Sequence, residues 1–143
     1  MTSIPDHCIK KKSDPLIVFS EKKSKITFEN PMQNKYFAIQ VDGCLFNSKD
    51  GVKCDKLLES EKYADQYFVE LKGGETSEAV KQLEVTIDKL PARLGGAKRM
   101  AFAVFSNTCP KCDTTRQAIE KRFKNKKITI VFCRSGHKHH LER

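Results

Sequence analysis

A charged pair interrupts an apolar stretch near the middle of the chain. The sequence YFVELKGG, residues 67–74, places Glu70 and Lys72 two positions apart, directly before two glycines. Side chains alternate faces along a β-strand, so both charges are predicted to lie on one face. Upstream, Asp55 lies in the apolar stretch CDKLL, where an unpaired buried carboxylate would be costly. Two carboxylates beside an ammonium group could hold a hard divalent cation and orient a water molecule.

The same three residues also have a purely structural interpretation. Asp55, Glu70 and Lys72 could form a cross-strand ion-pair cluster on a solvated face, where each pair contributes only ~0–1 kcal/mol. The apolar flanks of both strands favour the functional interpretation, as does the helix expected after the glycines, because that helix must cover part of the same sheet. A second acid-x-Lys match, at residues 21–23, is predicted to form a turn.

The elements around these residues alternate between strand and helix patterns. Short runs of β-branched and aromatic residues predict strands at 16–20 and 25–29, followed by a three-stranded meander over 36–72. Beyond the glycines, apolar residues recur between 79 and 90 at steps of four, four and three, which predicts a helix with Thr76 or Ser77 as N-cap that ends before Pro91. A buried strand at 99–106, a helix opening with a capping box of Thr114 and Gln117 and ending near Phe123, and a last strand at 126–132 complete the pattern.

This order predicts an α/β or α+β fold, with a mixed β-sheet that contains an N-terminal β-meander and has helices packed on it. At 143 residues the chain suits one domain with a real core, which we place at 16–133. Residues 1–15 are polar and predicted to form a loose arm, and residues 134–143 a basic, His-rich, mobile tail.

The positive charge of the chain is concentrated in its C-terminal third. Residues 1–91 hold 14 Lys and Arg against 15 Asp and Glu, whereas residues 92–143 hold 13 against 3. Such asymmetry suits a polyanionic partner, most often nucleic acid, through neutralisation of phosphates. Solvated, lysine-rich helix faces explain the charge equally well. The basic side chains that we expect to contact phosphates are Arg99, Arg116, Lys121, Arg122 and Lys124.

The arrangement of charged residues resembles the PD-(D/E)XK phosphodiesterase superfamily, the fold of many restriction enzymes and Holliday-junction resolvases. In that family an Asp near the start of one strand precedes an (E/D)xK motif on the next, and a helix and a strand follow. Asp55 matches the first position and residues 70–72, ELK, match the second. Residues 75–90 and 99–106 match the helix and the strand, so the resemblance covers roughly residues 36–132.

The resemblance implies a restriction-endonuclease-like core and a metal-dependent nuclease. Asp55 and Glu70 would bind Mg²⁺ or Mn²⁺, and Lys72 would hold the attacking water or stabilise charge on the phosphate. The chain departs from the family in two ways: Cys54 stands where proline often precedes the Asp, and the acidic N-terminal helix that often supplies a further ligand is not evident.

Three further side chains are candidates for the same site. Asp42, in QVDGCLF, and Glu29, in TFENP, compete for the role of third metal ligand, and Asp42 could equally be a bulge or strand end without such a role. Gln82 lies on the predicted helix at a place where the family often has a polar site residue, although a solvated helix glutamine is the commoner case.

The six cysteines are expected to be reduced, because the chain lacks a secretory signal pattern and their spacing is uneven. Cys44 and Cys54 flank a predicted turn and could be cross-strand neighbours. Cys109 and Cys112 form a CxxC that could bind zinc with Cys133 and a histidine, or act in thioredoxin-like redox chemistry at a strand-to-helix turn. Loop cysteines without a function remain the favoured interpretation.

The sequence thus predicts a cytoplasmic, divalent-metal-dependent nuclease, with DNA favoured over RNA as substrate and no membrane partner. The competing hypothesis is a non-catalytic module of the same fold that binds nucleic acid or a protein partner. Both hypotheses are compatible with a homodimer.

Overall fold

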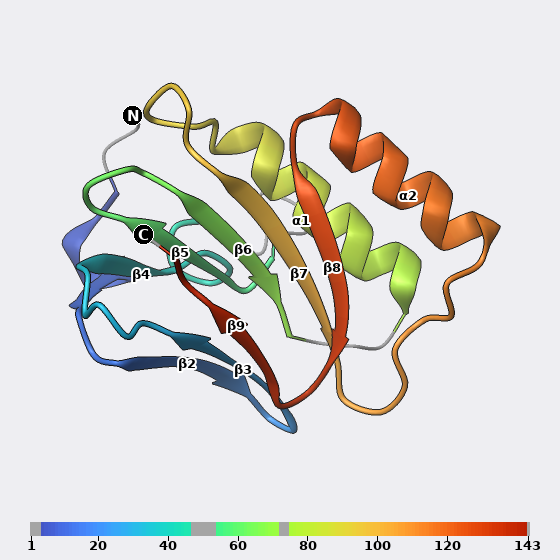
Figure 1. Cartoon of the computed structure of the whole chain (residues 1–143), viewed down its shortest axis with the longest axis horizontal. Helices are drawn as coiled ribbons and strands as arrows, with labels where there is room; N and C mark the ends of the chain where they lie inside the picture. The colour runs from blue at the N-terminus through green and yellow to red at the C-terminus, as the bar shows by residue number, and fades with distance from the viewer. Residues whose placement is uncertain (1–3, 47–53, 72–74, 143) are drawn as a thin grey trace.

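The computed structural model describes residues 4–46, 54–71 and 75–142, which form two β-sheets and two α-helices (Figure 1). The elements are, in chain order, the 3-10 helix η1 (Asp6–Cys8), β1 (Ile9–Lys12), β2 (Leu16–Glu21), β3 (Ser24–Glu29), β4 (Tyr36–Gln40), β5 (Lys56–Ser60), β6 (Gln66–Glu70), α1 (Thr76–Lys89), β7 (Arg99–Phe105), α2 (Thr114–Asn125), β8 (Thr129–Arg134) and β9 (His137–His140).

The larger sheet has six strands in the order β1-β4-β5-β6-β7-β8. Strands β1, β4, β5 and β6 pair antiparallel, and the expected meander is confirmed as β4-β5-β6. Strands β6, β7 and β8 pair parallel, because α1 and α2 carry the chain back to the same end of the sheet before each new strand begins. The mixed sheet with helices packed on it is therefore confirmed.

The smaller sheet has three strands in the order β2-β3-β9 and uses a segment that the sequence pattern did not identify as a strand. We expected residues 134–143 to form a mobile tail, but His137–His140 pairs parallel with β3. The expected loose arm also differs, since Ile9–Lys12 pairs with β4 at the edge of the larger sheet. Both segments are short and polar, so apolar alternation does not identify them as strands. They are held as strands by backbone hydrogen bonds to a neighbouring strand.

Two apolar clusters lie on opposite faces of the larger sheet, and they follow the alternation of its strands. Phe68, Ala101 and Ala103 face the helices together with the buried side of α1 and α2. Tyr67 and Phe102, one position away on the same strands, face the smaller sheet. The molecule is thus layered as helices, six-stranded sheet and three-stranded sheet (Figure 1). Because both faces of β6 are covered, a charge on this strand is buried.

Two local details differ from the sequence prediction. Helix α2 is capped by Asp113, whose carboxylate accepts the backbone N–H of Arg116 at 3.0 Å, and not by the predicted box of Thr114 and Gln117. A disulfide joins Cys8 to Cys44, with the Cα atoms 5.7 Å apart, where we expected reduced thiols. It ties the segment before β1 to the segment after β4, and cysteine connectivity of this kind cannot be read from spacing alone.

Candidate active site

The carboxyl ends of the three parallel strands meet at one edge of the larger sheet. Strand β6 ends there at Glu70, β7 at Phe105 and β8 at Arg134. The turn between β2 and β3 lies at the same edge, at the bottom of Figure 1, where the hydroxyl of Ser135 donates to the carbonyl of Lys23 at 3.1 Å. In open sheets with parallel strands, ligands bind at this kind of edge.

Glu70 and Asp55 are buried next to one another on neighbouring strands. Asp55 directly precedes β5, its backbone N–H donates to Val69 at 3.0 Å, and its side chain is 2% exposed. The Oδ2 atom of Asp55 accepts the backbone N–H of Leu71 at 2.7 Å, so this carboxylate also fixes the end of β6. Glu70, the last residue of β6, is 1% exposed. The structure therefore brings together the two carboxylates that the sequence predicted to share a site.

The thiol of Cys54 lies within the electrostatic reach of both carboxylates. Burial raises the pKa of Cys54 far above its ordinary range, and the negative charges of Glu70 and Asp55 raise it further. The backbone N–H of Cys54 donates to the Oγ1 atom of Thr86 on α1 at 2.9 Å. The carboxylates thus lie between the sheet and α1, in surroundings where a cation would be stabilised.

A hollow of about 480 Å³, here called the edge pocket, opens beside Glu70. Gln82 reaches it from α1, so the structure brings this predicted residue to Glu70. The β2–β3 turn, which the sequence analysis set aside, forms another wall of the edge pocket. Its described lining residues are Glu21, Lys22, Lys23, Ser24, Glu70, Leu71, Glu75, Glu78, Ala79, Gln82 and Ser106. These residues come together because segments distant in the sequence pack against one another. The acid-x-Lys spacing at residues 21–23 was the only sequence feature that pointed to the β2–β3 turn as part of a site.

The remaining predicted ligands are placed differently from one another. Lys72 lies outside the described residues. Asp42 is partly exposed, just beyond β4, and its neighbour Val41 donates its N–H to the carbonyl of Asp55 at 3.0 Å. Glu29 lies five positions beyond Ser24 along β3, about 16 Å at ~3.3 Å per residue, at the far end of the smaller sheet. Asp42 is therefore the nearer candidate for a third ligand, and Glu29 is removed from the site.

A preformed cluster of three metal-type ligands occurs at one place among the described residues. It consists of His7, Cys8 and Cys44, whose ligand atoms lie within 4.8 Å of one another, and the disulfide occupies both thiols. Asp42, Asp55 and Glu70 do not reach this proximity as a set. A cation at Asp55 and Glu70 would need further oxygen ligands from waters, substrate or a shifted side chain, as Mg²⁺ commonly has.

Two of the five basic residues expected to contact phosphates, Arg99 and Arg116, are partly buried and engaged in internal contacts. Arg99 donates to the Oε1 atom of Gln66 at 2.7 Å and to the carbonyls of Ile87 and Leu90 at 3.1 and 2.8 Å, and burial lowers its pKa. The guanidinium of Arg116 lies 5.0 Å from the ring centre of Phe132. The Arg99 contacts hold the C-terminal end of α1, and Arg116 donates to the carbonyl of Pro110 at 2.8 Å in the loop before α2.

The other three basic residues lie along α2. Arg122 forms two hydrogen bonds with Glu84, at 2.7 and 3.1 Å. Lys121 and Lys124 are exposed. Lys124 lies ten positions after Thr114, which is about 15 Å along the helix at ~1.5 Å per residue. Because α2 begins at the edge of the parallel strand ends and runs away from it, these charges lie far from Glu70.

The CxxC lies between β7 and α2, at the strand-to-helix position that the sequence predicted. Cys112 is exposed and Cys109 partly buried. Cys109 shares a shallow hollow with Cys133 and His137. Burial and the nearby Cys109 raise the pKa of Cys133 to about 12, so this thiol is protonated at neutral pH. The four residues of the predicted zinc set are not gathered in the described structure.

Comparisons of the chain with family models, with curated proteins and with solved structures found no match. Within the described residues, no helix is long and apolar enough to cross a membrane. The functional assignment therefore rests on the geometry of the edge pocket and its carboxylates.

Proposed function

We propose that this protein is a divalent-metal-dependent nuclease with its site at Asp55 and Glu70. The observation that carries the proposal is the burial of these two carboxylates side by side, with Glu70 lining the edge pocket. Buried like charges are costly unless a cation or a shared proton compensates them. A bound Mg²⁺ or Mn²⁺ compensates both charges, and its oxygen-ligand preference matches carboxylates.

The order of elements around the carboxylates supports the same proposal. An antiparallel meander β4-β5-β6 carries Asp55 before its middle strand and Glu70 at the end of its last strand, and α1 leads into the parallel strand β7. This order matches the one that the PD-(D/E)XK resemblance implies, so we propose a restriction-endonuclease-like core. DNA is the proposed substrate, with RNA as the alternative.

Each residue has a proposed task in cleavage. Asp55 and Glu70 hold the metal, with Asp42 as the third ligand, and Gln82 positions a polar group of the substrate or a water at the wall of the pocket. When bound, the metal lowers the pKa of a water and neutralises charge on the scissile phosphate. Lys72 stabilises the negative charge that develops on the phosphate in the transition state.

The experiment is an incubation of purified protein with linear duplex, nicked duplex and single-stranded nucleic acids, with and without Mg²⁺ or Mn²⁺. We expect metal-dependent cleavage that falls more than about 100-fold in Glu70→Gln and Asp55→Asn, because loss of an outer-sphere partner of a metal ligand already costs 10–100-fold. Lys72→Ala should lose cleavage and keep metal binding, because lysine acts in the transition state. Glu142→Gln, an exposed carboxylate far from the pocket, is the matched control and should cleave as the wild type does.

A non-catalytic module that binds nucleic acid or a protein partner is the second candidate. It is favoured by the hydrogen bond from Leu71 to Asp55, which gives this carboxylate a structural task without any metal. Metal-independent binding of nucleic acid, without cleavage of any of the substrates above, would support this candidate and overturn the nuclease proposal. A dimer detected by light scattering would be compatible with either function.

A further inference from the structure

A second hollow, of about 250 Å³, lies between the two sheets along the open edge of β2. It is here called the lysine groove, because Lys10, Lys12 and Lys56 contribute to its walls. Its other described lining residues are His7, Cys8, Val18, Phe19, Ser20, Ala38, Ile39 and Gln40. Among these described residues there is no carboxylate, although the region before residue 92 holds slightly more acidic than basic residues. The local excess of positive charge is therefore a property of the groove.

The register of the larger sheet explains why these lysines face the groove. Lys10 pairs with Ala38 and Lys12 with Tyr36, and both partners pack against the smaller sheet. Paired residues of antiparallel strands point to the same face, so Lys10 and Lys12 face the smaller sheet as well. That sheet has three strands against six, and its strand β2 contributes Val18, Phe19 and Ser20 to the groove. Lys10 and Lys12 therefore lie on β1, at the edge of the larger sheet, where the smaller sheet ceases to cover it.

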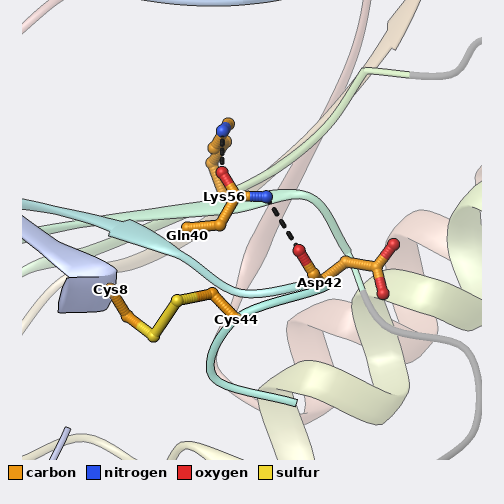
Figure 2. Close-up of a disulfide and its surroundings, with 5 residues drawn as sticks. All are labelled: Cys8, Gln40, Asp42, Cys44 and Lys56. Carbon is orange, nitrogen blue, oxygen red and sulfur yellow. Dashed lines mark hydrogen bonds between the residues drawn. A yellow bond between two sulfur atoms is a disulfide. The ribbon is translucent and has the colours of Figure 1, made fainter. Parts of the chain in front are cut away.

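Lys56 is held in place by contacts that connect the groove to the candidate active site. Its ammonium group donates to the Oε1 atom of Gln40, and the Nε2 atom of Gln40 donates to the carbonyl of Asp42 at 2.7 Å (Figure 2). The carboxylate of Asp42 points away from Gln40 and from the disulfide in the same view. Lys56 directly follows Asp55 in the chain. The groove residue Lys56 is therefore adjacent in the chain to one proposed metal ligand, and Gln40 contacts the backbone of another.

The disulfide fixes the opposite wall. Cys8 lines the groove and is bonded to Cys44, which follows Asp42 by two positions (Figure 2). Cys8 also precedes β1, the strand that carries Lys10 and Lys12. The distance between the two lysines of β1 and the Gln40–Lys56 contact is thus restrained by a covalent bond.

Consecutive residues of β2 line the lysine groove and the edge pocket. Ser20 lines the groove, and the next residue, Glu21, lines the edge pocket that contains Glu70. The exposed turn residues Lys22 and Lys23 add two further cations at the edge pocket. A chain of negative charges could therefore contact Lys10, Lys12 and Lys56 and pass to Glu70.

We propose that the lysine groove binds the phosphate backbone of one nucleic acid strand and guides that strand to the edge pocket. Lys10 and Lys12 lie two positions apart on a strand, about 6.6 Å, so the two ammonium groups can contact different phosphates of one nucleic acid strand. The guidance of the strand to a cleavage site rests on the proposed nuclease function. The binding of the strand in the groove does not require cleavage. It replaces the α2 residues as the principal phosphate contacts.

The test measures binding of a short fluorescent single-stranded DNA by anisotropy, in EDTA so that no metal-dependent cleavage occurs, from about 50 to about 200 mM salt. The variant is Lys10→Gln/Lys12→Gln/Lys56→Gln. Loss of three phosphate contacts should lower the slope of log affinity against log salt by about 2, since each contact contributes ~0.7 for a single strand, and should raise the Kd roughly 10–100-fold. Lys62→Gln/Lys121→Gln/Lys124→Gln removes the same charge from exposed sites elsewhere and should leave the slope unchanged.

The outcomes separate the groove from the nuclease proposal. If the wild type cleaves and the groove variant binds with an unchanged slope, the groove assignment is overturned and the nuclease stands. If binding depends on the groove but no nucleic acid is cleaved with Mg²⁺ or Mn²⁺, the groove stands and the nuclease falls. Groove-dependent binding of polyglutamate without groove-dependent binding of DNA overturns the nucleic acid assignment. Should the triple variant fail to fold, Lys10→Gln alone, at an exposed position, should lower the slope by about 0.7, and no change would overturn the proposal.

Discussion

Buried polar and charged side chains lie at both ends of strand β6, but their surroundings differ. They contact donors of the framework at the start of the strand, and carboxylates lie close together at its end. At the start of the strand, Asp65 accepts the backbone N–H of Lys98 at 2.8 Å, and Gln66 accepts from Arg99 at 2.7 Å. On the neighbouring strand, Glu59 lies opposite Gln66 and accepts from Arg93 at 3.0 Å. Each acidic or amide oxygen at this end is directed at a donor that belongs to the framework of the fold.

At the finish of β6 the charges are gathered rather than dispersed. Asp55 and Glu70 are buried together, and both raise the pKa of Cys54. Three more glutamates line the edge pocket beside them. Burial of a charged residue is therefore not itself a sign of function. The informative feature is several carboxylates that converge on a hollow, because clusters of interacting titratable groups beside a cleft are typical of binding and catalytic sites.

The largest expected effect on stability comes from the start of the strand. Arg99→Met removes hydrogen bonds to Gln66, Ile87 and Leu90 and leaves two carbonyls at the end of α1 without this donor. We expect the free energy of unfolding to fall by about 2–4 kcal/mol, measured by urea denaturation. Arg134→Met, at an exposed position, is the control. A loss below about 0.5 kcal/mol, the usual range for surface substitutions, would show that Arg99 is available for phosphate binding after all.

A smaller loss is expected for Glu59→Gln at the same end. The substitution keeps the shape of the side chain but removes the charge that accepts from Arg93, whose own side chain is 28% exposed. We expect a loss of about 1–2 kcal/mol in the free energy of unfolding, since hydrogen bonds to charged groups contribute somewhat more than neutral ones. An unchanged unfolding midpoint would contradict the view that this end of β6 uses its buried charge for stability.

The contrast between the two ends was only partly predictable from the sequence. Short runs of β-branched and aromatic residues identified β4, β5 and β6, and the step pattern of apolar residues identified α1, because both signals are local. The same local reasoning brought Asp55 to Glu70, since two strands joined by a short turn must pair.

Contacts between distant segments were not predictable in the same way. His137–His140 has no apolar alternation, and it becomes a strand only because β3 offers backbone partners more than 100 positions earlier in the chain. The β2–β3 turn was identified as a turn, but its place beside Glu70 depends on how the smaller sheet packs. The lysine groove was missed for the same reason, since Lys10 and Lys12 belonged to a segment expected to be a loose arm.

Protonation of His139 should reveal a further contribution from the start of β6. This imidazole lies 5.8 Å from the ring centre of Tyr67 and 5.0 Å from that of Phe102. Burial lowers its pKa, and the charges of His137, His140 and Lys98 add to this effect, while Glu142 opposes it. The unfolded state therefore binds the proton more readily, so stability is complete above about pH 6.5 and is lost as the pH falls.

The measurement is the melting temperature between about pH 7 and about pH 5, above the ordinary pKa of most carboxylates. It should fall with acidification in the wild type and fall less in His139→Phe, whose ring suits the same aromatic surroundings. His7→Gln, at an exposed position, should follow the wild type. Parallel curves for wild type and His139→Phe would exclude His139 as the source of the pH dependence.

The smallest change in the free energy of unfolding is expected for a substitution at the proposed metal site. Glu70→Gln removes one of two buried like charges, so in EDTA the free energy of unfolding should stay the same or rise by up to about 1 kcal/mol, in contrast to Glu59→Gln. Mn²⁺ should then raise the melting temperature of the wild type, because a ligand that binds only the folded state stabilises it, and should leave the variant unaffected. Glu142→Gln, with its side chain 72% exposed, should respond to Mn²⁺ as the wild type does. The opposite result would be a Glu70→Gln variant that is less stable by more than about 1 kcal/mol and responds to Mn²⁺ as the wild type does. Glu70 would then be a structural charge, like those at the start of β6, and the proposal of a metal at this edge of the sheet would be wrong.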